Sequence, residues 1–400
     1  MGADLARELA IPAETKLVLL VLDGLGGLPR EAGGPTELEA AAKPTLDRLA
    51  AEGVTGLLTL VAPGITPGSG PGHLALFGYD PLTHRIGRGI LEALGIDLPV
   101  TPQDVAARGN FCTVDGAGRV TDRRAGRVSD ATCQALSALL DTVKVEGAEV
   151  TVRPVREHRF VVLFRGEGLS DALSETDPQQ VGQAPLKAEP LTPEAAKSAR
   201  VVNAFVEEAR ALLKDRHPAN MVLLRGFARH PALPTFRERF GLRAAAIPVY
   251  PMYRGLARLA GMEILPTGTT IAEQLATLRE RWAEFDFFYV HVKRTDTAGE
   301  DGDFAAKVAA IEEVDRALPA LVALRPDVLA VTGDHSTPAA LRAHSWHPVP
   351  VLLWAKTCRP DTVTTFGERP CAAGGLGHLP GRELLTVMLA HAGRLTKFGA

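Results

Sequence analysis

Four apolar runs, each bounded by polar or turn-forming residues, constrain this chain more than any other feature. They lie at residues 16–22, 285–292, 327–333 and 350–354. Continuous apolar runs of this length are typical of strands covered on both faces of a parallel sheet. Helices are expected between them, at residues 44–52, 270–284 and 302–324. The alternation predicts an α/β domain with a doubly wound, mainly parallel sheet.

The middle of the chain has a different pattern. Shorter, alternating strands are expected at residues 109–114, 149–155 and 159–165, separated by helices at 130–140 and 193–214, and Pro-rich segments flank the region. We expect a smaller α+β domain inserted into the first, with residues 106–244 forming the insertion and residues 1–105 and 245–400 the discontinuous outer domain. One continuous large α/β domain is the alternative.

Composition excludes several classes of protein. The 400 residues suffice for two domains, and a net charge of −3 provides no basic field for nucleic acid. The four Cys show no CxxC spacing, which argues against a zinc knuckle or a thioredoxin site. The N-terminus lacks the apolar run of a signal peptide, and no early run is long enough to span a membrane. We expect a soluble, cytoplasmic protein that acts on a small molecule and could form a homo-oligomer.

Candidate metal ligands follow the predicted strands. Asp23, Asp296, Asp334 and His335 each lie just past a strand end, and His344 lies in the loop before the run at 350–354. Ligands of open parallel sheets bind outside the carboxyl ends of the strands, so these side chains are expected to converge. Singly, an Asp-Gly is usually a turn and an Asp-His is often a helix cap; together they favour metal binding.

Asp and His ligands suit Mn²⁺, Zn²⁺ or Co²⁺, and a lone Mg²⁺ less readily. Two such ions close together stabilise the entering and leaving oxygens of a phosphoryl transfer. A Gly/Pro-rich loop at residues 63–72 places Ser69 near the start of a helix, where backbone donors favour an anion. We therefore interpret Ser69 as a metal-activated nucleophile; a flexible turn with a capping serine is the alternative.

Two other catalytic patterns fail. Gly68 and Gly70 touch Ser69 directly, whereas a nucleophile elbow needs one residue between the serine and each glycine. The glycines at residues 24–27 lack the third glycine of a dinucleotide fingerprint.

The inserted region supplies cations in short clusters. Arg side chains in a Gly-containing loop fit a bidentate grip on phosphate and carboxylate, although a solvated charged loop is the alternative. Together with a lysine at the metal edge, the candidate substrate-binding residues are Arg108, Asp122, Arg123, Arg124, Arg127, His158, Arg225 and Lys293.

With these residues in hand, the chain resembles the cofactor-independent (2,3-bisphosphoglycerate-independent) phosphoglycerate mutases, more closely their archaeal-type branch, within the alkaline phosphatase superfamily. The matching segments span nearly the whole chain in order: LVLLVLDGLGGLP, TELEAAAKPTLDRLAAEG, GITPGSGPGHLALFGYDP, IGRGILEALG, RGNFCTVD, DRRAGR, HRFVVLFRGEGLS, HVKRTDTAGEDGD, VTGDHSTP and HSWHPVPVLLW.

The resemblance implies an isomerase that interconverts 3-phosphoglycerate and 2-phosphoglycerate through a phosphoserine, without bisphosphoglycerate, in glycolysis and gluconeogenesis. It implies two divalent ions (Mn, Mg, Zn or Co): Asp23, Ser69, Asp334 and His335 as ligands of one, Asp296 and His344 as ligands of the other. The family usually has His where this chain has Glu300, which we expect to bind the second ion and shift its preference toward Mn²⁺ or Mg²⁺; Asp301 or His347 could also contribute.

The resemblance also gives each domain a role: the outer domain is the metal-binding catalytic domain, and the insertion is a lid that excludes water. Arg123, Arg124 and Arg127 would hold the substrate carboxylate. Alternatives are a metal-dependent phosphatase, a mutase of phosphopentoses, a phosphonopyruvate-processing enzyme, and a metal-dependent binding protein that has lost catalysis.

Overall fold

The computed structural model describes residues 2–399, which divide into two compact units. Unit 1 comprises the chain up to Arg85 together with the chain from Leu233 onward, and unit 2 comprises Ile86–Ala232. The boundaries expected from the sequence fall inside strand β3 (Asp104–Val114) and at the first residue of strand β8 (Ala244–Pro248). The first boundary lies earlier than expected because helix α5 (Arg88–Gly95) packs on the strands of unit 2.

Within residues 2–399, unit 1 contains an eight-stranded sheet in the order β13-β2-β12-β11-β1-β10-β8-β9. β1 (Leu17–Leu22) pairs in parallel with both β10 (Phe287–Val292) and β11 (Val328–Thr332), which confirms the mainly parallel sheet. The outer strands are β2 (Val54–Thr59), β9 (Glu263–Ile264) and β13 (Gly377–Pro380).

The fourth apolar run forms β12 (Val349–Ala355), but it is antiparallel to β11, contrary to the expectation of a parallel strand. Parallel neighbours need a long crossover, usually through a helix. Residues 333–348, all of which the structure describes, contain no helix, so the chain returns directly beside β11 in the opposite direction.

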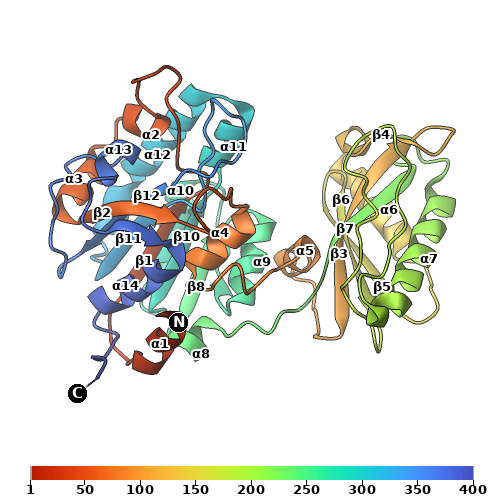
Figure 1. Ribbon diagram of the computed structural model, residues 1–400, viewed down its shortest axis with the longest axis horizontal. Helices are drawn as coiled ribbons and strands as arrows, with labels where there is room; N and C mark the ends of the chain where they lie inside the picture. The colour runs from red at the N-terminus through yellow and green to blue at the C-terminus, as the bar shows by residue number, and fades with distance from the viewer. Residues whose placement is uncertain (1, 400) are drawn as a thin grey trace. The chain divides into compact units, whose positions relative to one another are not determined.

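Helices cover both faces of this sheet, as a doubly wound sheet requires (Figure 1). One layer contains α2 (Glu37–Ala40), α3 (Pro44–Glu52), α10 (Ile271–Glu280), α11 (Arg294–Asp301) and α12 (Phe304–Val322). The other contains α1 (Gly2–Leu9), α4 (Ser69–Leu76), α8 (Phe236–Phe240), α9 (Pro251–Leu259) and α14 (Leu384–His391). A further short helix, α13 (Glu368–Cys371), packs near β2 and β12. No helix within residues 2–399 is both long and apolar enough to cross a membrane.

Unit 2 is built on an antiparallel sheet. β3 pairs with β4 (Val120–Asp122), β6 (Arg159–Arg165) and β7 (Met221–Arg229), and β6 pairs with β5 (Glu149–Arg156). Helices α6 (Asp130–Leu140) and α7 (Ala196–Leu213) pack on this sheet. Side chains alternate between the faces of a strand, so apolar residues of β3 face the core while Arg108 and Asn110 lie on the opposite face.

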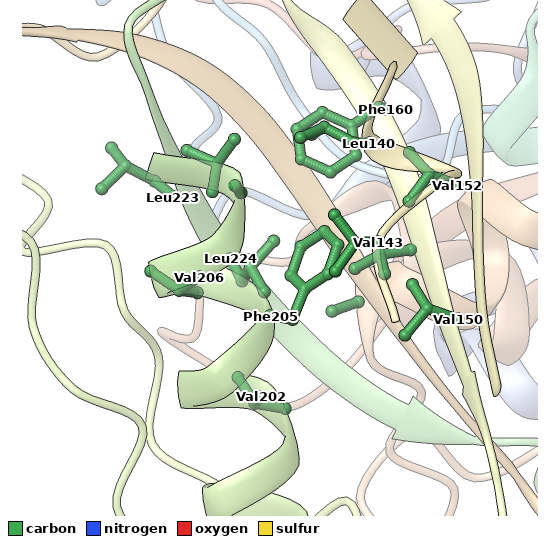
Figure 2. Close-up of a cluster of buried hydrophobic side chains, with 14 of the residues drawn as sticks. Leu140, Val143, Val150, Val152, Phe160, Val202, Phe205, Val206, Leu223 and Leu224 are labelled. Atoms are coloured by element: carbon green, nitrogen blue, oxygen red, sulfur yellow. The ribbon is translucent and has the colours of Figure 1, made fainter. Parts of the chain in front are cut away.

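The core of unit 2 lies between α7 and the sheet. Phe205 points from α7 toward side chains of the strands and of α6, and Val202 and Val206 flank it on the same helix (Figure 2). Phe205 is fully buried, and its ring meets that of Phe164 edge to face at a centroid distance of 5.6 Å. Unit 2 therefore has an apolar core of its own.

We predict that Phe205→Ala will destabilise unit 2 by about 3–5 kcal/mol, because it leaves a cavity in a close-packed core. Leu212→Ala on the same helix is the matched control, since Leu212 is partly exposed and should cost less than about 1 kcal/mol. Urea unfolding followed by circular dichroism will measure both. Equal unfolding curves for the two variants would contradict this account of the core.

Candidate active site

Strand ends of unit 1 bring five of the predicted ligands together. Asp23 directly follows β1, and its backbone N–H donates to the Val292 carbonyl at the end of β10 (2.9 Å). Asp296 lies in the first turn of α11, just after β10. Asp334 and His335 follow β11, and His344 lies in the connection to β12. All of them are fully buried except His344, whose side chain is 24% exposed.

The first group of candidate ligands is Asp23, Asp334 and His335, whose ligand atoms all lie within 4.8 Å of one another. His335 Nε2 is 3.3 Å from Asp23 Oδ1 and 3.2 Å from Asp334 Oδ2. Both of these carboxylate oxygens are buried, and neither has a hydrogen-bond partner among residues 2–399. Buried, unpartnered carboxylate oxygens beside an imidazole nitrogen fit a divalent cation.

The second group is Asp296, His335 and His344. His344 Nε2 is 3.6 Å from Asp296 Oδ1, and the His344 ring stacks on His335 at a centroid distance of 3.6 Å. Its other nitrogen, Nδ1, donates to the Pro67 carbonyl (3.1 Å), which leaves Nε2 free to bind a cation. Glu300 lies at the rim: its side chain is 56% exposed, and Oε1 is 3.8 Å from His344 Nε2.

Thr337 sets the orientation of His335. The Thr337 hydroxyl donates its proton to Asp296 Oδ1 (2.6 Å). Thr337 Oγ1 can therefore only accept from His335 Nδ1, which lies 2.9 Å away and must carry a proton. His335 Nε2 is then the nitrogen that faces the carboxylates. Burial favours the neutral imidazole, but Asp334, Asp23 and Asp296 outweigh it and raise the pKa of His335 to about 9. A cation bound at Nε2 would displace that proton.

Positive and polar groups surround the carboxylates. The Lys293 ammonium is 3.0 Å from Asp23 Oδ2 and 2.5 Å from Asp296 Oδ2, while the Tyr253 hydroxyl donates to Asp23 Oδ2. Burial opposes the charged form of Lys293, yet Asp23 and Asp296 raise its pKa above the usual value. Burial also works against the charged form of Asp23, but Lys293 and His291 hold its pKa well below the usual range. The carboxylate of Asp23 is thus kept ionised.

Ser69 is the first residue of α4, and its Oγ lies 3.2 Å from His335 Nε2. Two later residues of the same helix bind it to the ligand loop. A Cβ on Gly72 would lie 2.1 Å from the Asp334 carbonyl oxygen, so only glycine allows this approach. His73 Nδ1 is 2.8 Å from the Ser69 carbonyl and 3.1 Å from Asp334 Oδ2. The predicted nucleophile therefore meets the first ligand group.

The predicted cations of unit 2 form a separate basic cluster. A cavity of about 150 Å³ is lined by Arg108, Asn110, Arg123, Arg124, His158, Arg159 and Arg225. Burial, together with the neighbouring Arg159 and Arg108, lowers the pKa of His158 to about 4, so its imidazole is neutral at pH 7. Arg123 also makes a bidentate ion pair with Asp177 (3.0 and 2.6 Å). Such a cluster suits an anionic ligand.

Besides Lys293, two predicted substrate-binding residues lie outside this cluster. Asp122 accepts hydrogen bonds from the backbone N–H groups of Arg124 (2.8 Å) and Gly126 (2.6 Å), so it shapes the arginine loop. Arg127 is exposed and does not line the cavity as the described residues define it.

Several site residues were not predicted from the sequence. His73, Tyr253, His291, Lys307 and Thr337 surround the carboxylates or bind the loops that carry them. Only His73 had a local signal, since it lies one helical turn after Ser69 and therefore on the same face of α4.

Comparisons with known proteins identify the family. The family model of 2,3-bisphosphoglycerate-independent phosphoglycerate mutases matches residues 50–220. Proteins named as probable members of that family are 52% identical in Thermotoga neapolitana and 53% identical in Thermus thermophilus, each match covering 98% of both chains.

Solved structures are also similar over nearly the whole chain. A Pyrococcus horikoshii protein is 29% identical with a TM-score of 0.84, covering 97% of this chain and 100% of its own. The cofactor-independent phosphoglycerate mutase of Thermoplasma acidophilum is 30% identical with a TM-score of 0.73, covering 94% and 100%. Because sequence identity above half extends over nearly the full length, this chain belongs to the family of 2,3-bisphosphoglycerate-independent phosphoglycerate mutases.

Proposed function

We propose that this chain interconverts 3-phosphoglycerate and 2-phosphoglycerate through a phosphoserine at Ser69, at a site that binds two divalent ions. The observation that carries the proposal is the position of Ser69 Oγ, 3.2 Å from His335 Nε2 at the start of α4. There it lies beside Asp23 and Asp334, whose buried oxygens have no hydrogen-bond partner within residues 2–399.

The ligands divide into two sets in this proposal. Asp23, Ser69, Asp334 and His335 hold one ion, and Asp296, His344 and Glu300 hold the other. When bound, the ions lower the pKa of the serine hydroxyl and neutralise charge on the phosphoryl group. The side chains of the two ligand sets decide which of Mn²⁺, Mg²⁺, Zn²⁺ and Co²⁺ binds best. Together the sets contain three or four carboxylates, which favour the harder ions.

The chain's own residues account for the transfer. Ser69 Oγ forms a bond to phosphorus while the bond from phosphorus to the substrate oxygen breaks. The serine proton ends on that oxygen, so no proton is released overall. The other hydroxyl of the bound glycerate then forms a bond to phosphorus while the bond from phosphorus to Ser69 Oγ breaks, and the proton of that hydroxyl returns to Ser69. The backbone N–H groups of Ser69 and Gly70 precede the first helical hydrogen bond, which runs from the Gly72 N–H to the Gly68 carbonyl (3.0 Å), and they favour the negative charge.

We propose that the basic cluster of unit 2 binds the carboxylate of the substrate, as the lid role expected from the sequence requires. Arg108, Arg124 and Arg225 supply planar guanidinium groups, and neutral His158 supplies an uncharged partner. A mutase must hold the glycerate and exclude water while Ser69 carries the phosphoryl group. In a phosphatase, water hydrolyses the phosphoserine instead.

Ser69→Ala tests the function directly. We expect mutase turnover to fall by on the order of 10³-fold or more, because the covalent nucleophile is lost. The assay offers 3-phosphoglycerate without bisphosphoglycerate and measures 2-phosphoglycerate and free phosphate separately. Circular dichroism should show an unchanged fold, since Ser69 is only partly buried. Near-normal turnover in the variant would exclude Ser69 as the nucleophile, and free phosphate as the main wild-type product would indicate a phosphatase.

Metal titration tests the second ligand set. Chelated protein should bind two Mn²⁺ ions in calorimetry, and Glu300→Ala should weaken one of the two sites by about tenfold or more. Glu300→His should shift the preference of that site toward Zn²⁺ or Co²⁺. Glu280→Ala is the control, because Glu280 is an exposed acid on α10 that belongs to neither proposed ligand set. Two sites of unaltered affinity in Glu300→Ala would show that Glu300 is not a ligand.

A further inference from the structure

Lys307 is a fully buried lysine in α12 whose ammonium makes three short hydrogen bonds. Its Nζ donates to the carbonyls of Gly24 (2.9 Å), Gly26 (2.9 Å) and Thr337 (2.8 Å). Burying a lysine without water is costly, and burial lowers the pKa of Lys307 although Glu37 and Glu368 oppose the shift. A residue with this cost needs a compensating role.

The three carbonyls belong to two different loops. Gly24 and Gly26 follow Asp23 at the end of β1, and Thr337 follows Asp334 and His335 at the end of β11. These loops also contact each other directly, since the Thr337 N–H donates to the Gly26 carbonyl (3.0 Å). Lys307 therefore joins the segments that carry the ligands of the first proposed ion.

The contact continues into the ligands through Thr337. The carbonyl of Thr337 accepts from Lys307, while its hydroxyl bonds Asp296 and His335. A Cβ on Gly24 would lie 2.4 Å from Thr337 Oγ1, and Gly24 has a positive φ of 63°, so the loops approach closely here. A shift of the three carbonyls that accept from the Lys307 ammonium would thus move Thr337 and the His335 imidazole that Thr337 orients.

Only lysine offers three donors on one atom and no acceptor. A neutral amide in its place would have two donors, and its oxygen would face carbonyl oxygens. The counter-charges are also in place. Glu37 accepts from the N–H groups of Leu28 (3.2 Å) and Ala339 (2.7 Å), and Glu368 accepts from Gly27 (2.7 Å). These carboxylates therefore bind the same two loops as Lys307, at residues further along each loop.

We infer that Lys307 is a positioning residue of the metal centre: its ammonium clamps the Asp23 loop to the Asp334–His335 loop, at the separation where their ligand atoms share one ion. This inference rests on the proposed function, because it requires that the first ligand group binds metal. Lys307 touches neither the ion nor the substrate in this account, and it acts through the backbone of the loops.

The test is metal affinity rather than activity. Chelated wild type, Lys307→Met and Leu318→Ala are titrated with Mn²⁺ by calorimetry, and their melting temperatures are measured without metal. Leu318 is a matched control, since it is fully buried on the same helix and lies well beyond the clamp. We expect Lys307→Met to bind one ion about 10–100-fold more weakly, the loss typical when a group that orients a ligand is removed.

Leu318→Ala should melt at a lower temperature but bind both ions as wild type does. At saturating Mn²⁺, Lys307→Met should regain turnover with an unchanged KM for 3-phosphoglycerate. If Lys307→Met cannot be obtained folded, Lys307→Gln replaces it: two of the three carbonyls keep a donor, and we expect a smaller loss of affinity.

Two outcomes would overturn the inference. Wild-type affinity in Lys307→Met, or in Lys307→Gln where that variant is used, would show that Lys307 contributes stability alone. An equal loss of affinity in Leu318→Ala would show that any destabilisation of α12 weakens the site. Failure of the wild type itself to bind Mn²⁺ would instead refute the proposed function on which the inference rests.

Discussion

Three fully buried carboxylates, those of Asp23, Asp296 and Asp334, lie close together at one edge of the sheet of unit 1. Like charges held away from water repel strongly, so this arrangement persists only if cations lie among them. Lys293 and His335 supply positive charge there, and the carboxylates raise the pKa of His335 to about 9. Divalent ions at the same place would also satisfy the oxygens that have no partner in the described chain.

The site at this edge of the sheet could be predicted because its carboxylates directly follow apolar runs in the sequence. Asp23, Asp296 and Asp334 follow apolar runs that are typical of central strands, and parallel strands end on one side. His344 was predicted at the same edge, but it precedes its strand, and the start of a parallel strand would lie at the opposite edge. The antiparallel direction of β12 is what places His344 beside Asp296, and the apolar run alone did not reveal that direction.

The rest of the site had no such pattern, because its contacts join distant segments through ordinary residues. From the sequence, Thr337 looks like an ordinary loop threonine and Lys307 like a charged residue on a helix. In the structure, both form hydrogen bonds with residues at the strand ends that carry the candidate ligands. Their roles depend on backbone carbonyls and hydroxyl directions, which periodicity does not encode. The first boundary of unit 2 was missed for a similar reason: α5 packs on β3 and β7, and its sequence does not indicate which sheet it covers.

The position of the serine follows from the same close packing. Gly72 lies against the Asp334 carbonyl, and His73 links the Ser69 backbone to the Asp334 side chain, so α4 cannot move without moving Asp334. The His344 contact to the Pro67 carbonyl adds a second link, from the serine loop to the other ligand group. Ser69, the proposed nucleophile, and both groups of candidate ligands are thus held by direct contacts rather than by a flexible loop. This is why a glycine-rich segment, which alone predicts only a turn, can hold the Ser69 hydroxyl in the fixed position that the proposed transfer requires.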